Sequence, residues 1–544
     1  MLTLILSLFA LNVPAQTPAR PGAGVIQKKL TLQEAVEIAL KANLEIEIEK
    51  TSLASARQAR HAARAFLDPT LGWQPAFETR SSPTGSILAS ATGKLTEHLN
   101  AQNFYFRQRA PWHGVSLQAG FENLRQSTNN PFTALNPWIT PRLSFSFSAP
   151  LLRGRQIDAE RADLVIRGKQ ENISAIELEL KVIDVIARLE QAYYDLVAVR
   201  TDLVVVEESV ALARDQLERT GRMIASGTVA PVELAAAEAE LERRKDNYFT
   251  TLSLLAQAEN ALKLLLSGGR EEDTWKDEII PASADRAPLP SEMEDASELA
   301  RQAIARRPEL KALVLQNEIN RTRQDLALDQ RKPLVNLSAS YLSSGLAGTA
   351  LTGGNPFSSL NEGIIGRLNL LSARAGLPPM PSVSFGGVPG DFVGGYGQSL
   401  SNLFSGRYPA FQAELKVEWN FRNTAAESAI AQNAINARRM ELQRKQIEQG
   451  IEAQVRNALQ AVATSRQRIA AAEASARAAR EKLESEIRLF QTGESTNFFV
   501  LTRQNEFSDS RRRAVVATLE FNKSAARLVF ALGRTLETHR VRVP

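Results

Sequence analysis

The chain of 544 residues contains no cysteine and only four histidines. Without cysteine it can form no disulfide framework, no thiolate nucleophile and no cysteine-ligated zinc site. The histidines are scattered, and no HExxH pair or GxSxG nucleophile elbow occurs. We therefore expect no catalytic residue, no metal site and no cofactor, and we interpret the histidines as packing or surface residues. They are His61, His98, His113 and His539.

The sequence also has little net charge and no long apolar run. Its 65 Lys and Arg residues against 60 Asp and Glu residues leave a net charge of +5. This imbalance is too small for the electrostatic footprint of a nucleic-acid-binding protein. No uncharged apolar stretch approaches the length of about 18 residues that marks a membrane-spanning helix. Any crossing of a membrane must therefore use β-strands.

The N-terminal segment resembles a signal peptide. Residues 1–10 form an apolar run, and the small-residue sequence Val13-Pro-Ala15 follows it. These features are typical of the core and cleavage site of a signal peptide, although the usual basic residues before the core are missing. We expect residues 1–15 to be a signal peptide. The alternatives are a true N-terminus that lies downstream of the assigned one, or a short buried segment.

The second half of the sequence echoes the first half at a nearly constant offset. Asp68-Pro69 corresponds to Lys332-Pro333 at 264 residues, and Ser226-Gly227-Thr228 corresponds to Thr492-Gly493-Glu494 at 266 residues. A constant offset indicates a duplicated unit rather than independent domains. The predicted division is a first repeat at 16–266, a linker at 267–297, a second repeat at 298–532 and a tail at 533–544.

Each repeat is predicted to end in a long helical hairpin, at residues 157–266 and 425–532. Apolar residues recur there at alternating spacings of three and four, as in the seam of a coiled coil. A helix over residues 157–225 would be about 100 Å long at 1.5 Å per residue, longer than a compact domain requires. The helices alone fit a soluble coiled-coil rod as well as a helical tube. Seam residues of the first arm are Val182, Val185, Leu189, Ala192, Leu196, Val199, Leu203, Val206, Val210, Ala213 and Leu217.

Four segments, residues 69–77, 142–149, 333–341 and 411–421, alternate apolar with polar side chains. A soluble sheet with one wet face shows the same alternation. The aromatic ends and the length of 411–421 favour strands that cross a membrane, which need about 9 to 11 residues. The expected lipid-facing residues are Trp73, Phe145, Phe147, Phe411, Leu415 and Trp419.

Two strand pairs cannot close a barrel, and lipid does not tolerate an open sheet edge. Other copies of the chain must therefore complete the barrel, and three copies of four strands give twelve strands with a tube of helices. The segments that join the strands of each pair, 81–141 and 343–408, are predicted to be long external loops. The first of them also allows an extra hairpin, at 103–109 and 115–123.

The order of these features resembles that of the TolC-like outer-membrane efflux proteins. The residues that carry the resemblance are Leu30-Thr-Leu-Gln-Glu-Ala-Val-Glu-Ile-Ala-Leu40, Pro150-Leu-Leu-Arg-Gly154, Ala305-Arg-Arg-Pro-Glu-Leu310 and the two glycine-containing hairpin tips. The resemblance implies a mainly α fold with membrane β-strands, namely a homotrimer with a 12-stranded outer-membrane barrel, a periplasmic helical tunnel and an equatorial region at 267–297. It further implies an exit duct for an inner-membrane pump, joined to it by a periplasmic adaptor protein, and no enzymatic activity.

Two other kinds of protein remain as alternatives. A non-transporting periplasmic or surface coiled-coil protein would share the helical hairpins but would not conduct ions. An adaptor would need a lipoyl-like or barrel domain between two hairpin arms, whereas the strands here lie outside the hairpins. The sequence indicates neither the transported substrate nor the class of pump.

The resemblance also implies roles for the hairpin tips, which dock the adaptor in the family. The corresponding residues are Ser226, Gly227, Thr228 and Val229 in the first tip, and Thr492, Gly493, Glu494, Ser495 and Thr496 in the second. A turn without a partner is the alternative, because glycine adopts a positive φ without steric cost.

At the periplasmic gate the sequence departs from the family's best-known member. In that member an acid with Tyr and Arg partners helps to latch the closed state. The resemblance places Glu233 at the acid, but Phe490 and Ser495 at the two partners. The two aspartates that line the entrance correspond to Phe499 and Thr502. We expect a neutral entrance that does not bind multivalent cations. Closure is predicted to rest on packing of Phe490, Phe498 and Phe499, with Glu233 paired to Arg503. A displaced acidic ring of Glu484, Glu486 or Glu494 is the alternative.

Overall fold

The computed structural model describes residues 27–543, apart from residues 87, 88, 91, 228, 229, 270–274, 283–294, 352–355 and 382–386. The predicted signal peptide and the tip residues Thr228 and Val229 lie outside the described residues. The chain divides into two compact units. The sheet unit consists of Arg57–Lys169 and Asn317–Arg438, and the helical unit consists of the described residues up to Ala56, Gln170–Gln316 and those from Arg439 onwards.

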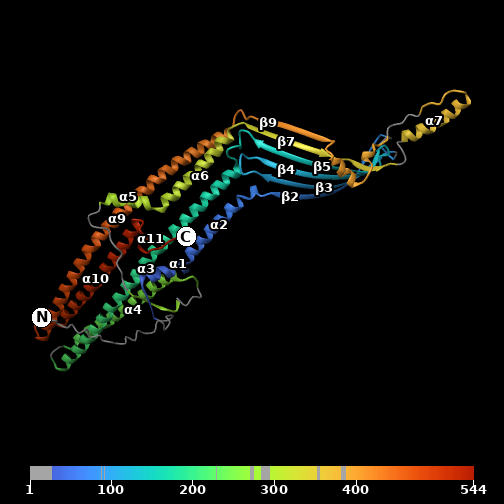
Figure 1. Cartoon of the computed structure of the whole chain (residues 1–544). Coiled ribbons are helices and arrows are strands. Elements are labelled where there is room, and N and C mark those ends of the chain that lie inside the picture. The colour runs from blue at the N-terminus through green and yellow to red at the C-terminus, as the bar shows by residue number, and fades with distance from the viewer. Residues whose placement is uncertain are drawn as a thin grey trace, which may run out of the picture. The chain divides into compact units, whose positions relative to one another are not determined.

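Long helices occupy both segments for which the apolar spacing predicts hairpins (Figure 1). In the first repeat α3 and α4 follow one another, and in the second α9 and α10 do. No helix in the described part of the chain is long and apolar enough to cross a membrane. The helices are α1 (Leu32–Ala42), α2 (Leu44–Ala62), α3 (Ala159–Ala225), α4 (Val232–Leu266), α5 (Ala296–Arg306), α6 (Pro308–Gln330), α7 (Pro356–Arg374), α8 (Tyr396–Phe404), α9 (Thr424–Gln491), α10 (Asn497–Ala531) and α11 (Thr535–Thr538).

The helical unit has its core along α3. Val185, Ile186, Leu189 and Leu196 are fully buried, and burying one such side chain contributes about 1.5–3 kcal/mol. Of the eleven seam residues predicted for this arm, seven are buried, and Ala192, Val199, Val210 and Leu217 are half-buried. This burial confirms that the apolar stripe at spacings of three and four is the packing face of the helix.

Short elements complete the helical unit. Strand β1 (Gln27–Leu30) pairs in parallel with β6 (Glu278–Pro281), which lies in the segment predicted to be equatorial. A capping box begins α1, because the Thr31 hydroxyl accepts a hydrogen bond from the Glu34 backbone while the Glu34 carboxylate accepts one from the Thr31 backbone. The Leu30 carbonyl also accepts a 3.0 Å hydrogen bond from the buried Tyr193 hydroxyl, which fixes β1 against α3.

The sheet unit contains one antiparallel sheet with six long strands in the order β2-β3-β4-β5-β7-β9 (Figure 1). A short strand, β8, also pairs with β5. The strands are β2 (Thr70–Pro83), β3 (Lys94–Arg109), β4 (Ser116–Thr128), β5 (Leu135–Pro150), β7 (Leu334–Ser344), β8 (Ala347–Ala350) and β9 (Pro409–Glu418).

Two expectations about this region need correction. The segment 81–141 is not one long loop, because β3, β4 and the start of β5 occupy most of it. The chain therefore contributes six long strands instead of four to one sheet. The extra hairpin that the sequence allows is confirmed, and its strands extend well beyond 103–109 and 115–123. In the second repeat, the segment 343–408 contains β8, α7 and α8.

Candidate functional site

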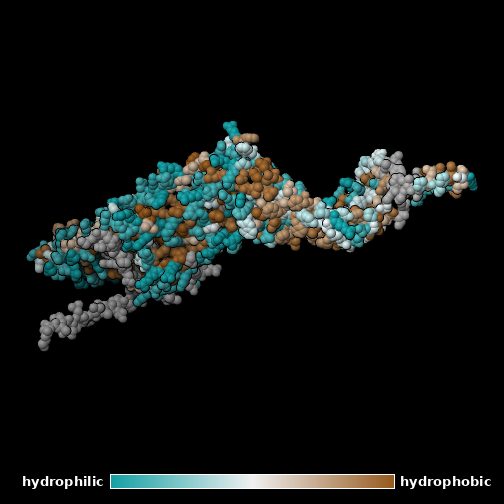
Figure 2. Space-filling model, turned by 45° about the horizontal axis from the view of Figure 1, so that its top comes forward, coloured by the Kyte–Doolittle hydropathy of each residue, from teal (hydrophilic) through white to brown (hydrophobic). Residues whose placement is uncertain are grey.

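The sheet has one apolar and one polar face. The strand register places Trp73 opposite Phe104, Phe104 opposite Phe121, and Phe121 opposite Leu143. Phe145 and Phe147 lie on the same face because they follow Leu143 at intervals of two. Phe145 lies opposite Tyr341, which in turn lies opposite Phe411. Figure 2 shows hydrophobic residues gathered over the sheet. The residues expected to face lipid therefore share one face of the sheet, except Trp419, which lies beyond the end of β9.

These residues are exposed in the single chain. Trp73 is 61% exposed and Phe411 is 76% exposed. Trp419 lies one residue beyond β9 and stacks on Phe421, with ring centroids 5.4 Å apart. Monomeric soluble proteins rarely leave a large contiguous patch of such residues in water. The structure thus groups the predicted lipid-facing residues, and their contact with lipid stays a prediction.

The opposite face of the sheet is polar. Gln74, Asn103, Glu122 and Arg142 follow one another across four neighbouring strands, and β9 adds Gln412, Glu414 and Lys416 to this face. Tyr105 lies on it between two glycines, Gly72 and Gly120. Its ring covers Gly72 so closely that a Cβ there would lie 2.2 Å from the ring. A sheet of this kind can separate a hydrocarbon phase from a water-filled space.

The turn between β3 and β4 packs against the connection from β5 to α3. Gly114, in this turn, has a φ of +66°, and an added Cβ would lie 2.8 Å from the Gly154 carbonyl oxygen. Gly154 has a φ of +82° and donates a 2.5 Å hydrogen bond to Asp329. Arg161 donates to the Gly154 carbonyl at 2.7 Å and to the Asp158 carboxylate at 2.8 Å. These contacts explain the glycine of the Pro150-Leu-Leu-Arg-Gly154 motif.

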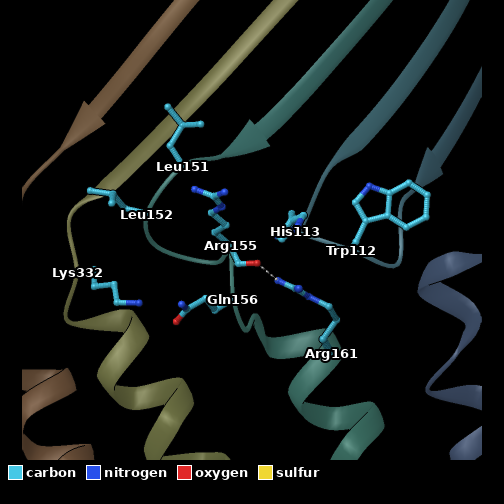
Figure 3. A pocket seen from close by; sticks show the side chains of 8 residues that line it. All are labelled: Trp112, His113, Leu151, Leu152, Arg155, Gln156, Arg161 and Lys332. Carbon is cyan, nitrogen blue, oxygen red and sulfur yellow. Dashed lines mark hydrogen bonds between the residues drawn. The ribbon is translucent and has the colours of Figure 1, made fainter.

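A cavity of about 620 Å³ lies beside this turn (Figure 3). Its lining contains three permanent cations and no carboxylate, although the neighbouring Asp158 and Asp329 pair with two of the cations. The Arg161 guanidinium also donates to the Arg155 carbonyl at 3.1 Å. The lining residues are Trp112, His113, Leu151, Leu152, Arg155, Gln156, Arg161 and Lys332.

In the helical unit, the hairpin tips turn at glycines with open surroundings. Gly227 has a φ of +76° and Gly493 a φ of +83°, and no atom lies within 4 Å of a Cβ added at either position. Ser226, Thr492, Glu494 and Thr496 are exposed, whereas Ser495 is half-buried and its hydroxyl donates to Glu486. The described tip residues are thus largely accessible, as docking requires, and docking itself stays a prediction.

The predicted ion pair between Glu233 and Arg503 is wrong. Glu233 accepts a 3.3 Å hydrogen bond from the Asn497 side chain. Arg503 instead pairs with Glu506 at 2.8 Å, one turn further along α10, and lies 3.8 Å from Glu486. Charge pairs one turn apart on a helix form readily, which explains the pair of Arg503 with Glu506.

A buried polar network joins three helices beside Glu233. Gln216 of α3 donates a 2.6 Å hydrogen bond to Asn497 of α10, which in turn donates to Glu233 of α4. Gln216 and Asn497 are each 3% exposed. The sequence reasoning missed both residues, although the position of Asn497 at the start of a helix after Ser495-Thr496 was a signal that could have drawn attention to it.

The remaining predicted gate residues lie near the start of α10 or the end of α9. Phe498 and Phe499 form an edge-to-face pair with centroids 5.7 Å apart and are 66% and 48% exposed. Phe490 and Thr502 are half-buried, and the Thr502 hydroxyl donates to the Phe498 carbonyl at 2.8 Å. Within one chain Phe498 and Phe499 are therefore not packed away, and closure by packing of the phenylalanines stays a prediction.

Two of the three alternative acids are engaged in ion pairs. Glu484 pairs with Arg480 at 3.0 Å, and Glu486 accepts from Ser495 and lies near Arg503. Glu494 is exposed. The structure thus gives a displaced ring of unpaired carboxylates little support.

The family model of outer membrane efflux proteins matches residues 114–268 and 367–534, which is more than half of the chain. The chain belongs to the outer membrane efflux protein family. Its place is accordingly the outer membrane, with a long periplasmic helical portion, and the predicted TolC-like fold class is confirmed. Among curated proteins, none matches the chain.

Solved structures of other membrane proteins share the fold. A membrane protein from Pseudomonas aeruginosa is 16% identical with a TM-score of 0.61, covering 95% of this chain and 99% of its own. CusC is 14% identical with a TM-score of 0.62 over 98% and 99%. The CmeC outer membrane channel of Campylobacter jejuni is 14% identical with a TM-score of 0.60 over 93% and 86%.

Proposed function

We propose that this protein is the outer-membrane exit duct of a tripartite efflux or type I secretion system. It works as a homotrimer that passively conducts substrates handed over by an inner-membrane pump and a periplasmic adaptor. It performs no chemical step on the substrate.

The observation that carries the proposal is the open, two-faced sheet. Its edge strands are β2 and β9, and every residue of β9 is exposed. One face carries aromatic residues and the other carries polar ones, so the sheet suits a wall between lipid and water. An edge with unpaired backbone groups is not stable in lipid, so β2 of one copy pairs with β9 of the next until the ring closes.

The helical hairpins supply the other part of the duct. The tips at Gly227 and Gly493 present small and polar exposed residues, among them Ser226, Thr492 and Thr496. An adaptor covers these tips, and the entrance between them opens when the helices separate. The exposed Phe498 and Phe499 pack against their counterparts in the closed trimer.

Purification of the full chain from outer membranes tests the proposal. Native mass spectrometry should give three chains per particle, and the same particles should conduct ions after reconstitution. A stable monomer would contradict the proposal, and so would a trimer that conducts nothing even after removal of the gate contacts. The latter result would favour a coiled-coil structural protein.

A further inference from the structure

The two repeats build their parts of the sheet differently. In the second repeat β7 pairs directly with β9, from Leu334 opposite Glu418 to Ser343 opposite Pro409. In the first repeat β2 and β5 hold the corresponding places, because Asp68-Pro69 precedes β2 as Lys332-Pro333 precedes β7. The hairpin β3–β4 lies between β2 and β5.

We propose that the hairpin β3–β4 is part of the channel wall, so that the trimer has an 18-stranded barrel in which Asn103 and Glu122 line the pore. This inference rests on the trimeric duct proposed above and specifies the width and lining of its membrane portion. Three copies of six strands replace three copies of four.

Continuous pairing supports this assignment. Strand β3 pairs with β2 from Thr70 opposite Arg107 to Pro83 opposite Lys94, without a register shift. It pairs on its other side with β4 from Glu97 opposite Thr128 to Arg109 opposite Ser116, again without a shift. A flap folded over one face of the sheet would leave β2 and β5 free to pair with each other, whereas here the hairpin supplies the partners of both.

The hairpin also continues both faces of the sheet. On the apolar side Trp73 stacks on Phe104 with centroids 6.2 Å apart, and its indole nitrogen donates to Gln102 at 3.0 Å. On the polar side Asn103 lies directly opposite Glu122. Since side chains alternate strictly along a strand, a hairpin whose two faces match those of its neighbours is built for the same two environments.

The hairpin is fixed at its turn as well. Gly114 packs against Gly154 and Pro150, and Arg109 at the end of β3 forms a 2.5 Å ion pair with Glu160 at the start of α3. These contacts tie the hairpin to the same connection that joins β5 to the long helix. The hairpin is therefore an integral part of the sheet and not an extension of a loop.

The consequence for the pore is a larger diameter. With strands about 4.8 Å apart and tilted by about 40°, a twelve-stranded barrel has a backbone diameter of about 24 Å and an eighteen-stranded barrel about 36 Å. The membrane portion would then admit bulkier cargo than a twelve-stranded wall of the same design.

The absence of cysteine in the chain permits a clean accessibility test. Single substitutions Asn103→Cys and Glu122→Cys place a thiol on the polar face, and Phe104→Cys and Phe121→Cys are matched controls one residue away on the apolar face. In reconstituted full-length trimers, a charged, membrane-impermeant methanethiosulfonate reagent should add one label per subunit to the first pair and none to the second. Equal labelling of both pairs would overturn the proposal.

Cryo-microscopy of the wild-type trimer counts the strands directly. Eighteen strands are expected, and a closed twelve-stranded barrel with the hairpin outside the wall would overturn this inference while leaving the duct intact. Absence of a trimer or of a closed barrel would instead refute the proposed function. Deletion of residues 94–128 adds a second readout, because β2 and β5 run antiparallel and the register then brings Trp73 opposite Leu143. That variant should give twelve strands.

Discussion

The side-chain amide of Asn497 donates a hydrogen bond to the Glu233 carboxylate, 3.3 Å away on another helix. Through its oxygen the same amide accepts a 2.6 Å hydrogen bond from Gln216. Glu233 is thus linked to α3 by the two neutral side-chain amides of Asn497 and Gln216, and not by an arginine. Because Gln216 and Asn497 are almost fully buried, the network holds α3, α4 and α10 together within one chain.

Replacement of Asn497 by Ala should loosen the contact among these three helices and, with it, the closure proposed for the entrance. The change leaves the buried Gln216 amide without its partner, at a cost of about 1–3 kcal/mol. Planar-bilayer recordings should show more frequent or larger openings than for the wild type. The exposed neighbour Thr496→Ala is the control and should leave the recordings unchanged. Identical gating of Asn497→Ala and the wild type would show that the network does not restrain the entrance.

Multivalent cations should not block the wild-type pore strongly. The sequence resemblance predicts that Phe499 and Thr502 replace two entrance acids, and Glu486 is engaged by Ser495 and Arg503. Introduction of a carboxylate ring by Thr502→Asp should create block by micromolar trivalent cations from the periplasmic side, because clustered charges in a narrow pore bind such ions tightly. Strong block of the wild type, abolished by Glu486→Gln or Glu494→Gln, would contradict a neutral entrance.

Bulky residues at the hairpin tips should abolish export while preserving the trimer. Gly227→Trp and Gly493→Trp enter open space, so they do not disturb the packing within the chain. Gly227→Ala and Gly493→Ala incur the same strain of a positive φ, roughly 1 kcal/mol, but stay small, and they should retain export. Trimer content is checked by native mass spectrometry. Export that survives both tryptophan changes would place adaptor docking elsewhere.

Acid should weaken the contact between α2 and α3 through Glu45. Two hydrogen bonds from Arg188, at 2.7 and 2.9 Å, hold the pKa of the Glu45 carboxyl below its ordinary value. A lowered pKa in the folded state means that the contact stabilises the protein above about pH 4.3, the ordinary value, and loses this effect as the pH falls through the lower folded value.

The pair is partly exposed, so its contribution is at most about 1 kcal/mol. Glu45→Gln should lower the thermal unfolding midpoint at pH 7 and should have little effect below the folded pKa. Glu47→Gln, at an exposed position of the same helix, is a control for changes in helix charge. An equal effect of Glu45→Gln at both pH values would show that the ion pair is not the cause.

The sequence predicts the long helices well because their packing depends on a local repeat. Val185, Leu189 and Leu196 recur at the spacing that makes a buried stripe, and they are buried. The β3–β4 hairpin is harder to predict over its full length. On its apolar face Phe104 and Phe106 give way to Gln102, Asn100 and His98, so the strict alternation fades beyond a few residues. The full length of its strands is instead defined by pairing with β2 on one side and β5 on the other.

The predicted gate residues show a different limit of prediction from the sequence. Matching positions to a relative identifies Glu233, but the partner of a carboxylate depends on helix rotation, which one sequence does not specify. Arg503 has Glu506 one turn away and Glu486 nearby, while Asn497 faces Glu233 from the first position of α10. The network could therefore be found only from the packed helices.

Conductance of the purified full-length protein tests the central claim most directly. Reconstituted into a planar bilayer, the wild-type trimer should produce discrete current steps, and Asn497→Ala should increase their open time or amplitude. Folded trimers that insert into the bilayer and yet pass no current in either form would contradict the assignment of this chain as an outer-membrane duct.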